Sequence, residues 1–166
     1  MIEIKEVDEL WFEKAKALVF GVFKYMDFPE RMSFWIYKNQ GNACVKMLMK
    51  LCGYTSAMKY WVAVDENEDV CGITGLYGNK SDKDEALWLS WFCVNPKHRG
   101  RGIGKQLIEF SIEEAKKHRK KYLRLYTSDD ANEADAQFLY EQYGFKIFKR
   151  EEKAGYTLIY REKELA

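Results

Sequence analysis

The chain has 166 residues, of which 47% are hydrophobic and 32% are charged, and its formal net charge at pH 7 is +1. This length predicts one domain, residues 1–166, with a sizeable core. The balanced charge argues against a nucleic-acid partner. No apolar run is long enough to span a membrane, and the first residues lack a signal-peptide pattern, so we expect no membrane partner.

The four cysteines, Cys44, Cys52, Cys71 and Cys93, form no C-x-x-C pair and have no histidine at zinc spacing. We therefore expect no metal site. Three of them lie within apolar runs, which is typical of small core residues in a reduced, cytoplasmic protein. His98 is expected to be a solvent-facing loop residue.

The first half of the chain predicts strands and helices in alternation. Asp8 is a candidate N-cap for the first helix. A polar loop at 65–69 separates two short apolar runs, which predicts a hairpin. From the apolar periodicity we expect strands at 2–5, 60–64 and 70–76, and helices at 10–23, 30–38 and 43–51.

The second half continues the alternation and completes the fold class. We expect strands at 87–94, 122–127, 145–150 and 156–160, and helices at 103–118 and 131–143. Together these elements predict an α/β (α+β) fold. Its sheet would be mixed, mainly antiparallel, with six to seven strands and helices on both faces.

A glycine-rich stretch lies between the apolar strand at 87–94 and the helix at 103–118. Unpaired N–H groups at a helix start bind anions, and glycines let a phosphate approach them. The stretch is not a Walker A loop, because Arg99 holds the leading glycine position, and its glycines do not fit G-x-G-x-x-G. We expect a diphosphate to bind Arg99, Gly100, Arg101, Gly102, Ile103, Gly104 and Lys105.

Two motifs carry a resemblance to a known family. Arg99, Gly102 and Gly104 form R-x-x-G-x-G, and residues 139–145 read LYEQYGF. This pair resembles the acetyl-coenzyme A loop and the closing helix of the GNAT N-acetyltransferase superfamily. The order of strand, loop, helix, strand and helix is also the same. The resemblance covers residues 69 to about 161 well and the first sixty or so only loosely.

The resemblance implies that acetyl-CoA is the cosubstrate and that two strands splay apart at its site. Phe92, Cys93 and Val94 match the strand that pairs with the pantetheine arm. Tyr140 matches the tyrosine that protonates the leaving thiolate. Asn132 is a candidate pantetheine contact, but it lies one residue from the usual position, and we prefer to interpret it as a helix cap.

The general base is not evident, because the strand at 87–92 has no carboxylate. Glu85 is our candidate, acting through water. Asp84, Asp27 and Glu30 are alternatives. Covalent catalysis through Cys93 is not expected, because no Cys–His pair is suggested.

The resemblance implies transfer of an acetyl group to a primary amine by direct attack. A small-molecule amine is slightly favoured over a peptide N-terminus or a protein lysine. A non-catalytic acyl-CoA sensor remains an alternative, and a homodimer is left open. Aromatic residues either line the acceptor pocket or belong to the core: Phe28, Phe34, Trp35, Tyr37, Trp88 and Trp91.

Overall fold

The computed structural model describes residues 1–23, 26, 28–55 and 58–165, without the side chains of residues 28 and 29. Asp27 and the Phe28 side chain, both named from the sequence, therefore lie outside the description. One seven-stranded sheet has the order β1-β2-β3-β4-β5-β7-β6. Its strands are β1 Glu3–Glu6, β2 Lys59–Val64, β3 Val70–Tyr77, β4 Ala86–Val94, β5 Tyr122–Ser128, β6 Lys146–Lys153 and β7 Tyr156–Glu164.

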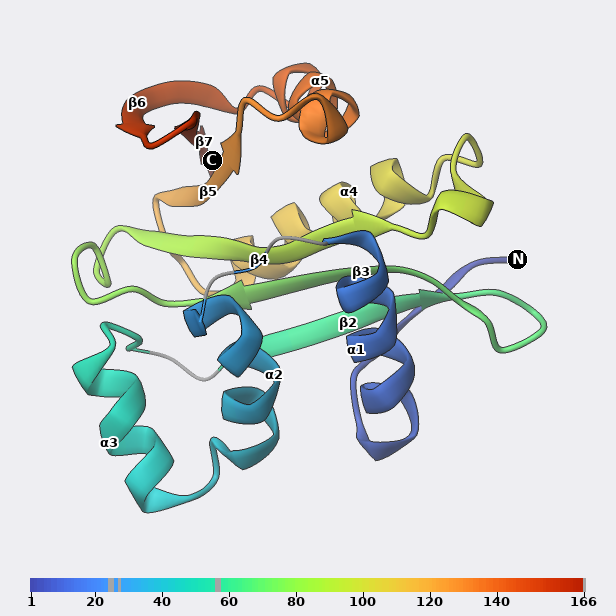
Figure 1. Cartoon of the computed structure of the whole chain (residues 1–166), viewed down its shortest axis with the longest axis horizontal. Helices are drawn as coiled ribbons and strands as arrows, with labels where there is room; N and C mark the ends of the chain where they lie inside the picture. Colours follow the sequence, from blue (N-terminus) through green and yellow to red (C-terminus); the bar gives the residue numbers. More distant parts are fainter. Residues whose placement is uncertain (24–25, 27, 56–57, 166) are drawn as a thin grey trace.

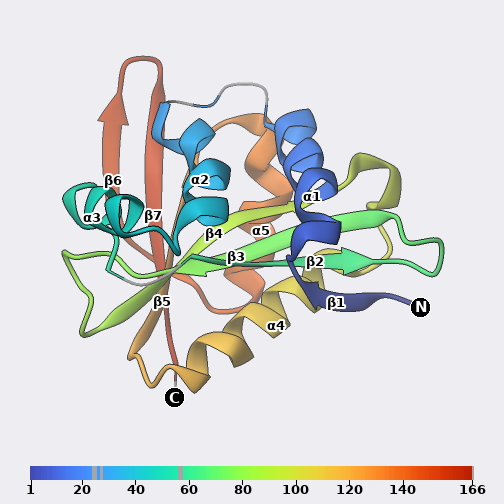
Figure 2. The ribbon, with the colours of Figure 1, turned by 90° about the horizontal axis from the view of Figure 1, so that it is seen from below.

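The helices cover both faces of this sheet, as Figures 1 and 2 show. Helices α1 and α2 pack on one face, with α3 beside α2, and α4 and α5 pack on the other. The predicted α/β fold with a mixed, mainly antiparallel sheet is confirmed. The helices are α1 Glu9–Val22, α2 Phe28–Asn39, α3 Ala43–Leu51, α4 Ile103–Lys117 and α5 Ala134–Gln142, with short 3₁₀ turns η1 Pro96–His98 and η2 Ala131–Glu133.

Each face of the sheet has its own apolar core. Under α1 and α2, the rings of Phe34 and Tyr60 lie 5.3 Å apart between centroids, and both residues are almost fully buried. On the other face, Leu107 and Ile108 of α4 are fully buried against the strands. The predicted cap at Asp8 is confirmed, since its carboxylate accepts from the Leu10 and Trp11 backbone N–H groups at 2.9 and 3.2 Å.

Strands β4 and β5 are the one parallel pair among the described strands, and they stay together only briefly. Ala86, Leu87 and Trp88 face Tyr122, Leu123 and Arg124, and pairing then ends. Figure 1 shows β5 turning away from β4 beyond this point. In β4 the register against β3 shifts at a bulge, where Trp91 has a φ of +39°. A bulge bends its strand and redirects its side chains, so it favours the divergence.

Three expectations from the sequence are corrected by the structure. Cys44 and Cys52 are exposed at the two ends of α3, so only Cys71 and Cys93 are core residues. The helix expected over 131–143 is divided into the turn η2 and helix α5. His98 is half-buried against Cys71 instead of facing solvent. In the described residues, no helix combines the length and apolar character that a membrane crossing requires.

Candidate active site

The glycine-rich stretch forms the N-terminus of α4, as its sequence predicts. Gly102 is the N-cap in the left-handed region, with φ of +76°, and no side chain caps the helix. A Cβ atom added to Gly100 or Gly102 would meet nothing within 4 Å. The first N–H groups of α4 therefore face open space at the positive end of the helix dipole, which suits a phosphate.

Three cations surround this helix start. Arg99, Arg101 and Lys105 are all exposed. Among the described residues none of them forms an ion pair, unlike the lysines of α4's last turns, which pair with Glu113 and Glu114. Free cations beside unpaired N–H groups make this helix start favourable for a ligand that carries phosphates.

Gly104 has a packing role that the motif did not indicate. A Cβ atom there would lie 3.4 Å from Leu139 Cδ2 and 3.7 Å from Val94 Cγ2. The absence of a side chain thus lets α4 approach α5 and β4 closely. Ile103, the residue before it, is buried in the core. Within the predicted loop, Ile103 and Gly104 hold the helix in place while Gly102 leaves its end open.

The second half of β4 is free along the side that faces β5. Beyond Trp88, the described part of β5 offers this strand no partner, so its edge N–H and C=O groups are available to a ligand. Phe92 and Val94 turn towards α4 and α5, whereas Cys93 is buried in the core under α1. Burial raises the pKa of the Cys93 thiol to about 12, so this group is neutral at physiological pH.

Tyr140 of α5 lies against this open part of β4. Its ring contacts Phe92 at 5.6 Å and Phe145 at 5.7 Å between centroids, and only 3% of the residue is exposed. Among the described residues its hydroxyl has no hydrogen-bond partner. Burial, with a smaller contribution from Glu133, raises the pKa of the phenol, so the group keeps its proton at neutral pH.

Two further polar groups, on β5 and β7, are buried without a partner within the described residues. They are the Thr127 hydroxyl on β5 and Nε of Arg161 on β7. The other end of Arg161 donates to Glu141 at 2.9 Å and to Gln137 at 3.3 Å. Buried polar atoms are normally satisfied. Together with the open β4 edge and the uncapped α4, these two atoms are candidate contacts for a polar ligand.

Asn132 does not cap α5, which corrects the preferred interpretation of that residue. Its side chain donates to Asp130 Oδ1 at 2.8 Å, and it is Asp130 that caps the short turn η2. The next residue, Glu133, points back to β5 and accepts from the Ser128 hydroxyl at 2.6 Å. Asn132 is exposed, so its expected contact with pantetheine stays a prediction.

Glu85 lies at the opposite end of β4 from the glycine-rich loop. Its carboxylate is 3.5 Å from Arg124, and its side chain is 61% exposed. Arg124 makes shorter ion pairs, at 2.6 Å with Asp82 and 3.0 Å with Glu162. The structure thus brings Tyr140 to the open part of β4 but places Glu85 in a charged cluster where β4 and β5 are still paired.

The aromatic residues expected at the acceptor site divide between core and surface. Phe34 and Trp88 are buried, Tyr37 and Trp91 are half-buried, and Trp35 is 46% exposed. A hollow of about 530 Å³ lies between α1 and α2. Its described lining comprises Phe12, Glu13, Lys16, Phe20, Phe23, Met26, Arg31, Phe34, Trp35 and Lys38.

This hollow adjoins the open part of β4 through Trp91. The Trp91 ring lies 5.3 Å from Phe23 and 6.3 Å from Phe34, both of which line the hollow. Its indole N–H donates to the Ser33 hydroxyl at 2.7 Å, which ties the bulge to α2. Sequence reasoning missed Thr127, Ser33 and Arg161, because a polar residue in a strand or amphipathic helix gives no local sign that it is buried.

Comparison with known proteins identifies the family. The family profile described as Acetyltransferase (GNAT) domain matches residues 56–147, more than half of the chain. The chain belongs to the GNAT acetyltransferase family. The matched range contains β2 to α5, and so includes the open part of β4, the α4 N-terminus and Tyr140.

Known relatives agree with this assignment. The chain is 31% identical over 101 residues, 61% of its length, to a Xenopus tropicalis protein named Probable N-acetyltransferase 14, of which it spans about half (47%). A GNAT-family acetyltransferase from Staphylococcus aureus has the same fold over all of both chains, with a TM-score of 0.74 and 20% identity. A Bacillus anthracis protein described as a streptothricin acetyltransferase, solved with acetyl coenzyme A, matches 66% of this chain and 64% of its own, with a TM-score of 0.57 and 21% identity.

Proposed function

We propose that this protein is an N-acetyltransferase that moves the acetyl group of acetyl-CoA to a primary amine by direct attack. The observation that carries the proposal is that three features meet at the gap between the diverging strands β4 and β5. These are the uncapped start of α4, the unpaired edge of β4, and the buried hydroxyl of Tyr140. A sensor that only bound coenzyme A would have no need of the third.

Different residues around this gap would bind different parts of acetyl-CoA. The N–H groups after Gly102 would bind the pyrophosphate, with Arg99, Arg101 and Lys105 supplying positive charge. The edge of β4 from Leu89 to Val94 would pair with the pantetheine arm, and an N–H of this edge would polarise the thioester carbonyl. The buried Thr127 and Arg161 groups would offer that arm two further polar partners.

Tyr140 would donate its proton to the leaving sulfur as the bond to the acetyl group breaks. The raised pKa of the phenol keeps it protonated until a thiolate forms beside it. Cys93 is not needed, because its thiol stays neutral in the core. We retain Glu85 as the terminal acceptor of the amine proton through water. Glu30, at the start of α2, is the alternative nearer to Trp91.

We propose a small-molecule amine with an apolar body as the acceptor, entering by the hollow between α1 and α2. The aromatic side chains of that hollow would contact the body of the amine. Three cations and one carboxylate, Lys16, Arg31, Lys38 and Glu13, line it. This excess of positive charge disfavours a linear polyamine and favours a monoamine that carries an anionic group. The four free cysteines support a reducing compartment, such as the cytoplasm.

One screen tests both the proposed acetyl transfer and the proposed class of acceptor. The purified protein is incubated with acetyl-CoA and an amine panel, and release of the free thiol is followed. The panel contains an aromatic monoamine, the amino acid with the same ring, a linear polyamine and a lysine peptide. We expect turnover with the first two and the highest kcat/KM for the amino acid. Binding of acetyl-CoA without thiol release from any amine would favour the sensor, and preference for the peptide would favour a protein acceptor.

A further inference from the structure

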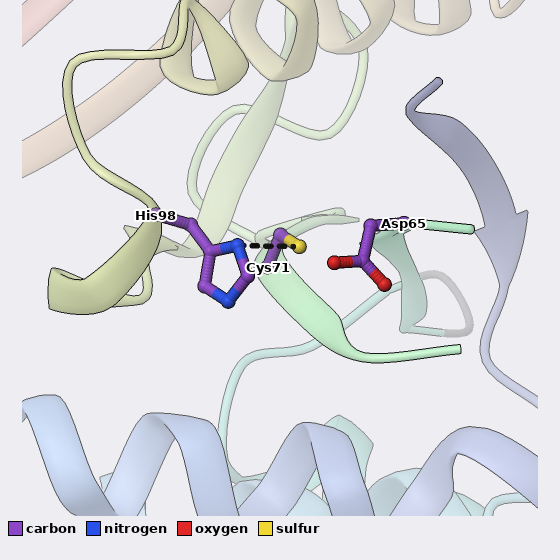
Figure 3. A group of neighbouring side chains, drawn as sticks. All are labelled: Asp65, Cys71 and His98. Carbon is purple, nitrogen blue, oxygen red and sulfur yellow. Dashed lines mark hydrogen bonds between the residues drawn. The ribbon is translucent and has the colours of Figure 1, made fainter. Parts of the chain in front are cut away.

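A cluster of three side chains lies outside the proposed active site, at the far end of the β2–β3 hairpin. Asp65 follows β2, Cys71 lies in β3, and His98 ends the turn η1. One potential ligand atom from each lies within 4.8 Å of the other two. Figure 3 shows the Cys71 sulfur between the His98 ring and the Asp65 carboxylate. Segments 27 residues apart in the chain thus bring a thiol, an imidazole and a carboxylate to one point.

Two of the ligand atoms contact each other, and the third residue keeps one oxygen free. Cys71 Sγ is 3.2 Å from His98 Nδ1. Asp65 uses one oxygen, Oδ1, to accept from the backbone N–H groups of Asn67 and Asp69, both at 3.0 Å. These bonds hold the carboxylate in place and leave Oδ2 available. Before any ion binds, the carboxylate is therefore positioned by its own turn, and the thiol and the imidazole are positioned by their contact with each other.

We propose that Asp65, Cys71 and His98 bind a divalent transition-metal ion, and that Zn²⁺ is the ion they suit best. Tetrahedral zinc with a thiolate at about 2.3 Å and an imidazole nitrogen at about 2.0–2.1 Å places those two ligand atoms roughly 3.5 Å apart. The 3.2 Å between Sγ and Nδ1 is close to that separation. The carboxylate oxygen lies within 4.8 Å of the other two ligand atoms, so the exposed turn that carries Asp65 has to move inwards to complete the set.

The ligand set also selects against other ions. A thiolate is a poor ligand for Mg²⁺ and Ca²⁺, which prefer oxygen, and a carboxylate is a poor ligand for Cu⁺. One thiolate, one imidazole and one carboxylate suit Zn²⁺, with water completing the coordination. Asp65 and His98 are half-buried, whereas Cys71 is fully buried, so an ion would enter between the first two.

Metal binding changes the protonation of Cys71. Burial and the neighbouring carboxylates raise the pKa of its thiol, which donates to the Asp69 carbonyl at 3.3 Å. As the sulfur–metal bond forms, the thiol proton leaves to solvent and this hydrogen bond is lost. His98 binds as the neutral imidazole through Nδ1.

The position of the site gives the ion a structural consequence. His98 directly precedes Arg99, the first residue of the predicted phosphate loop, while Asp65 and Cys71 belong to the β2–β3 hairpin. A bound ion would cross-link the hairpin to the segment that leads into α4. The site is separate from the open edge of β4, so its test does not depend on whether the protein transfers acetyl groups.

Cobalt titration of the full chain tests the proposal, with Cys44→Ser and Cys52→Ser introduced first to remove the exposed thiols. Co²⁺ bound by a thiolate gives a charge-transfer absorption in the near ultraviolet. We expect this band to saturate at one Co²⁺ per chain and Zn²⁺ to displace it. Cys71→Ser should abolish the band, and Asp65→Asn and His98→Gln should each raise the dissociation constant at least tenfold. His118→Gln, at the other histidine, is the matched control and should change nothing.

Several results would overturn the site. They are no thiolate band in the parent chain, a band that survives Cys71→Ser, or wild-type affinity in either Asp65→Asn or His98→Gln. Circular dichroism checks that each variant is folded. Should Cys71→Ser unfold, the other two variants decide the question. Asp65→Asn keeps the oxygen that accepts from the turn, and His98 is only half-buried.

Discussion

The two ends of the β4–β5 pair use the same strands in opposite ways. At one end the strands are hydrogen-bonded for three residue pairs, and Arg124 ties Asp82, Glu85 and Glu162 together across them. At the other end the bulge at Trp91 bends β4, the strands part, and buried polar groups have no partner within the described residues. We call these the tied end and the open end.

The comparison indicates how a sheet can hold a gap without losing stability. The charged cluster and the β5–β7 ladder fix β5 on one side, and α4 and the β3–β4 ladder fix β4 on the other. The open end can then leave backbone groups unpaired for a ligand. Changes at the open end should therefore alter binding and turnover, whereas changes at the tied end should alter stability.

The largest effect is expected at Tyr140. Tyr140→Phe keeps the ring between Phe92 and Phe145 and removes only the hydroxyl, so folding and acetyl-CoA affinity should change little. Loss of a general acid typically costs about 10²-fold or more in kcat. Steady-state kinetics with the best amine of the panel measures this loss in kcat. Tyr143→Phe, at the C-cap of the same helix, is the control, because its hydroxyl donates to the exposed Glu109. Equal kcat in both variants would reduce Tyr140 to a packing residue.

The next effect is expected at Gly102. A side chain at φ of +76° is strained and would occupy the open space before α4, where the phosphates are expected. Gly102→Val should raise the dissociation constant of acetyl-CoA by at least about tenfold, or about 1.4 kcal/mol. Calorimetry gives the affinity.

The matched control for this variant is Gly155→Val. Gly155 also has positive φ with open space around it, but it lies in the β6–β7 turn. Its substitution should cost stability with no change in affinity. Should both variants bind acetyl-CoA as the parent does, the phosphates must lie elsewhere. Gly104→Val is a poorer test, because its side chain would also press on Leu139.

A smaller effect, on stability alone, is expected at the tied end. Asp82 accepts from the Trp88 indole at 3.0 Å and pairs with Arg124, and little of its side chain is exposed. Asp82→Asn removes the charge but keeps an acceptor for Trp88, and Glu162 still pairs with Arg124. We expect a loss of about 1 kcal/mol in the free energy of unfolding. Urea denaturation measures it, with exposed Asp84→Asn as control. If acetyl-CoA affinity changed more than stability, the assignment of stability to the tied end and of binding to the open end would be contradicted.

The sequence predicted most of the secondary structure for two reasons: helices such as α4 bury one face, and strands such as β2 and β3 are largely apolar runs bounded by polar loops. The strand expected over 87–94 is β4 Ala86–Val94, and the helix over 103–118 is α4 Ile103–Lys117. The loop motif and Tyr140 could be found because a glycine run and a helix motif are local in the chain.

What escaped prediction depends on contacts between distant segments. The Asp82–Arg124 pair joins residues 42 apart, and Cys71 and His98 are 27 apart. The bulge at Trp91 could not be predicted, because no glycine marks its positive φ in the sequence. Packing against Phe23 and Phe34 holds Trp91 in that conformation instead. Asn132 could not be placed either, since both Asp130 and Asn132 can cap a helix and only the structure shows which one does.

The smallest effect on turnover is expected at Glu85, which belongs to the tied end by position and would act in the reaction only through water. Its side chain is largely exposed, and its distance to Arg124, 3.5 Å, is the longest in the charged cluster. Glu85→Gln should therefore lower kcat/KM by about tenfold or less, because water can deliver the proton to other acceptors. The pH profile of kcat/KM separates the cases, since a dedicated base adds an acidic limb that Glu85→Gln removes. A loss above about 10³-fold would make Glu85 a direct base and join the two ends functionally. No loss at all would move the search to Glu30, near the start of α2. The backbone carbonyl of Glu30 accepts from the Ser33 hydroxyl at 2.7 Å, and that hydroxyl accepts from Trp91 at the open end.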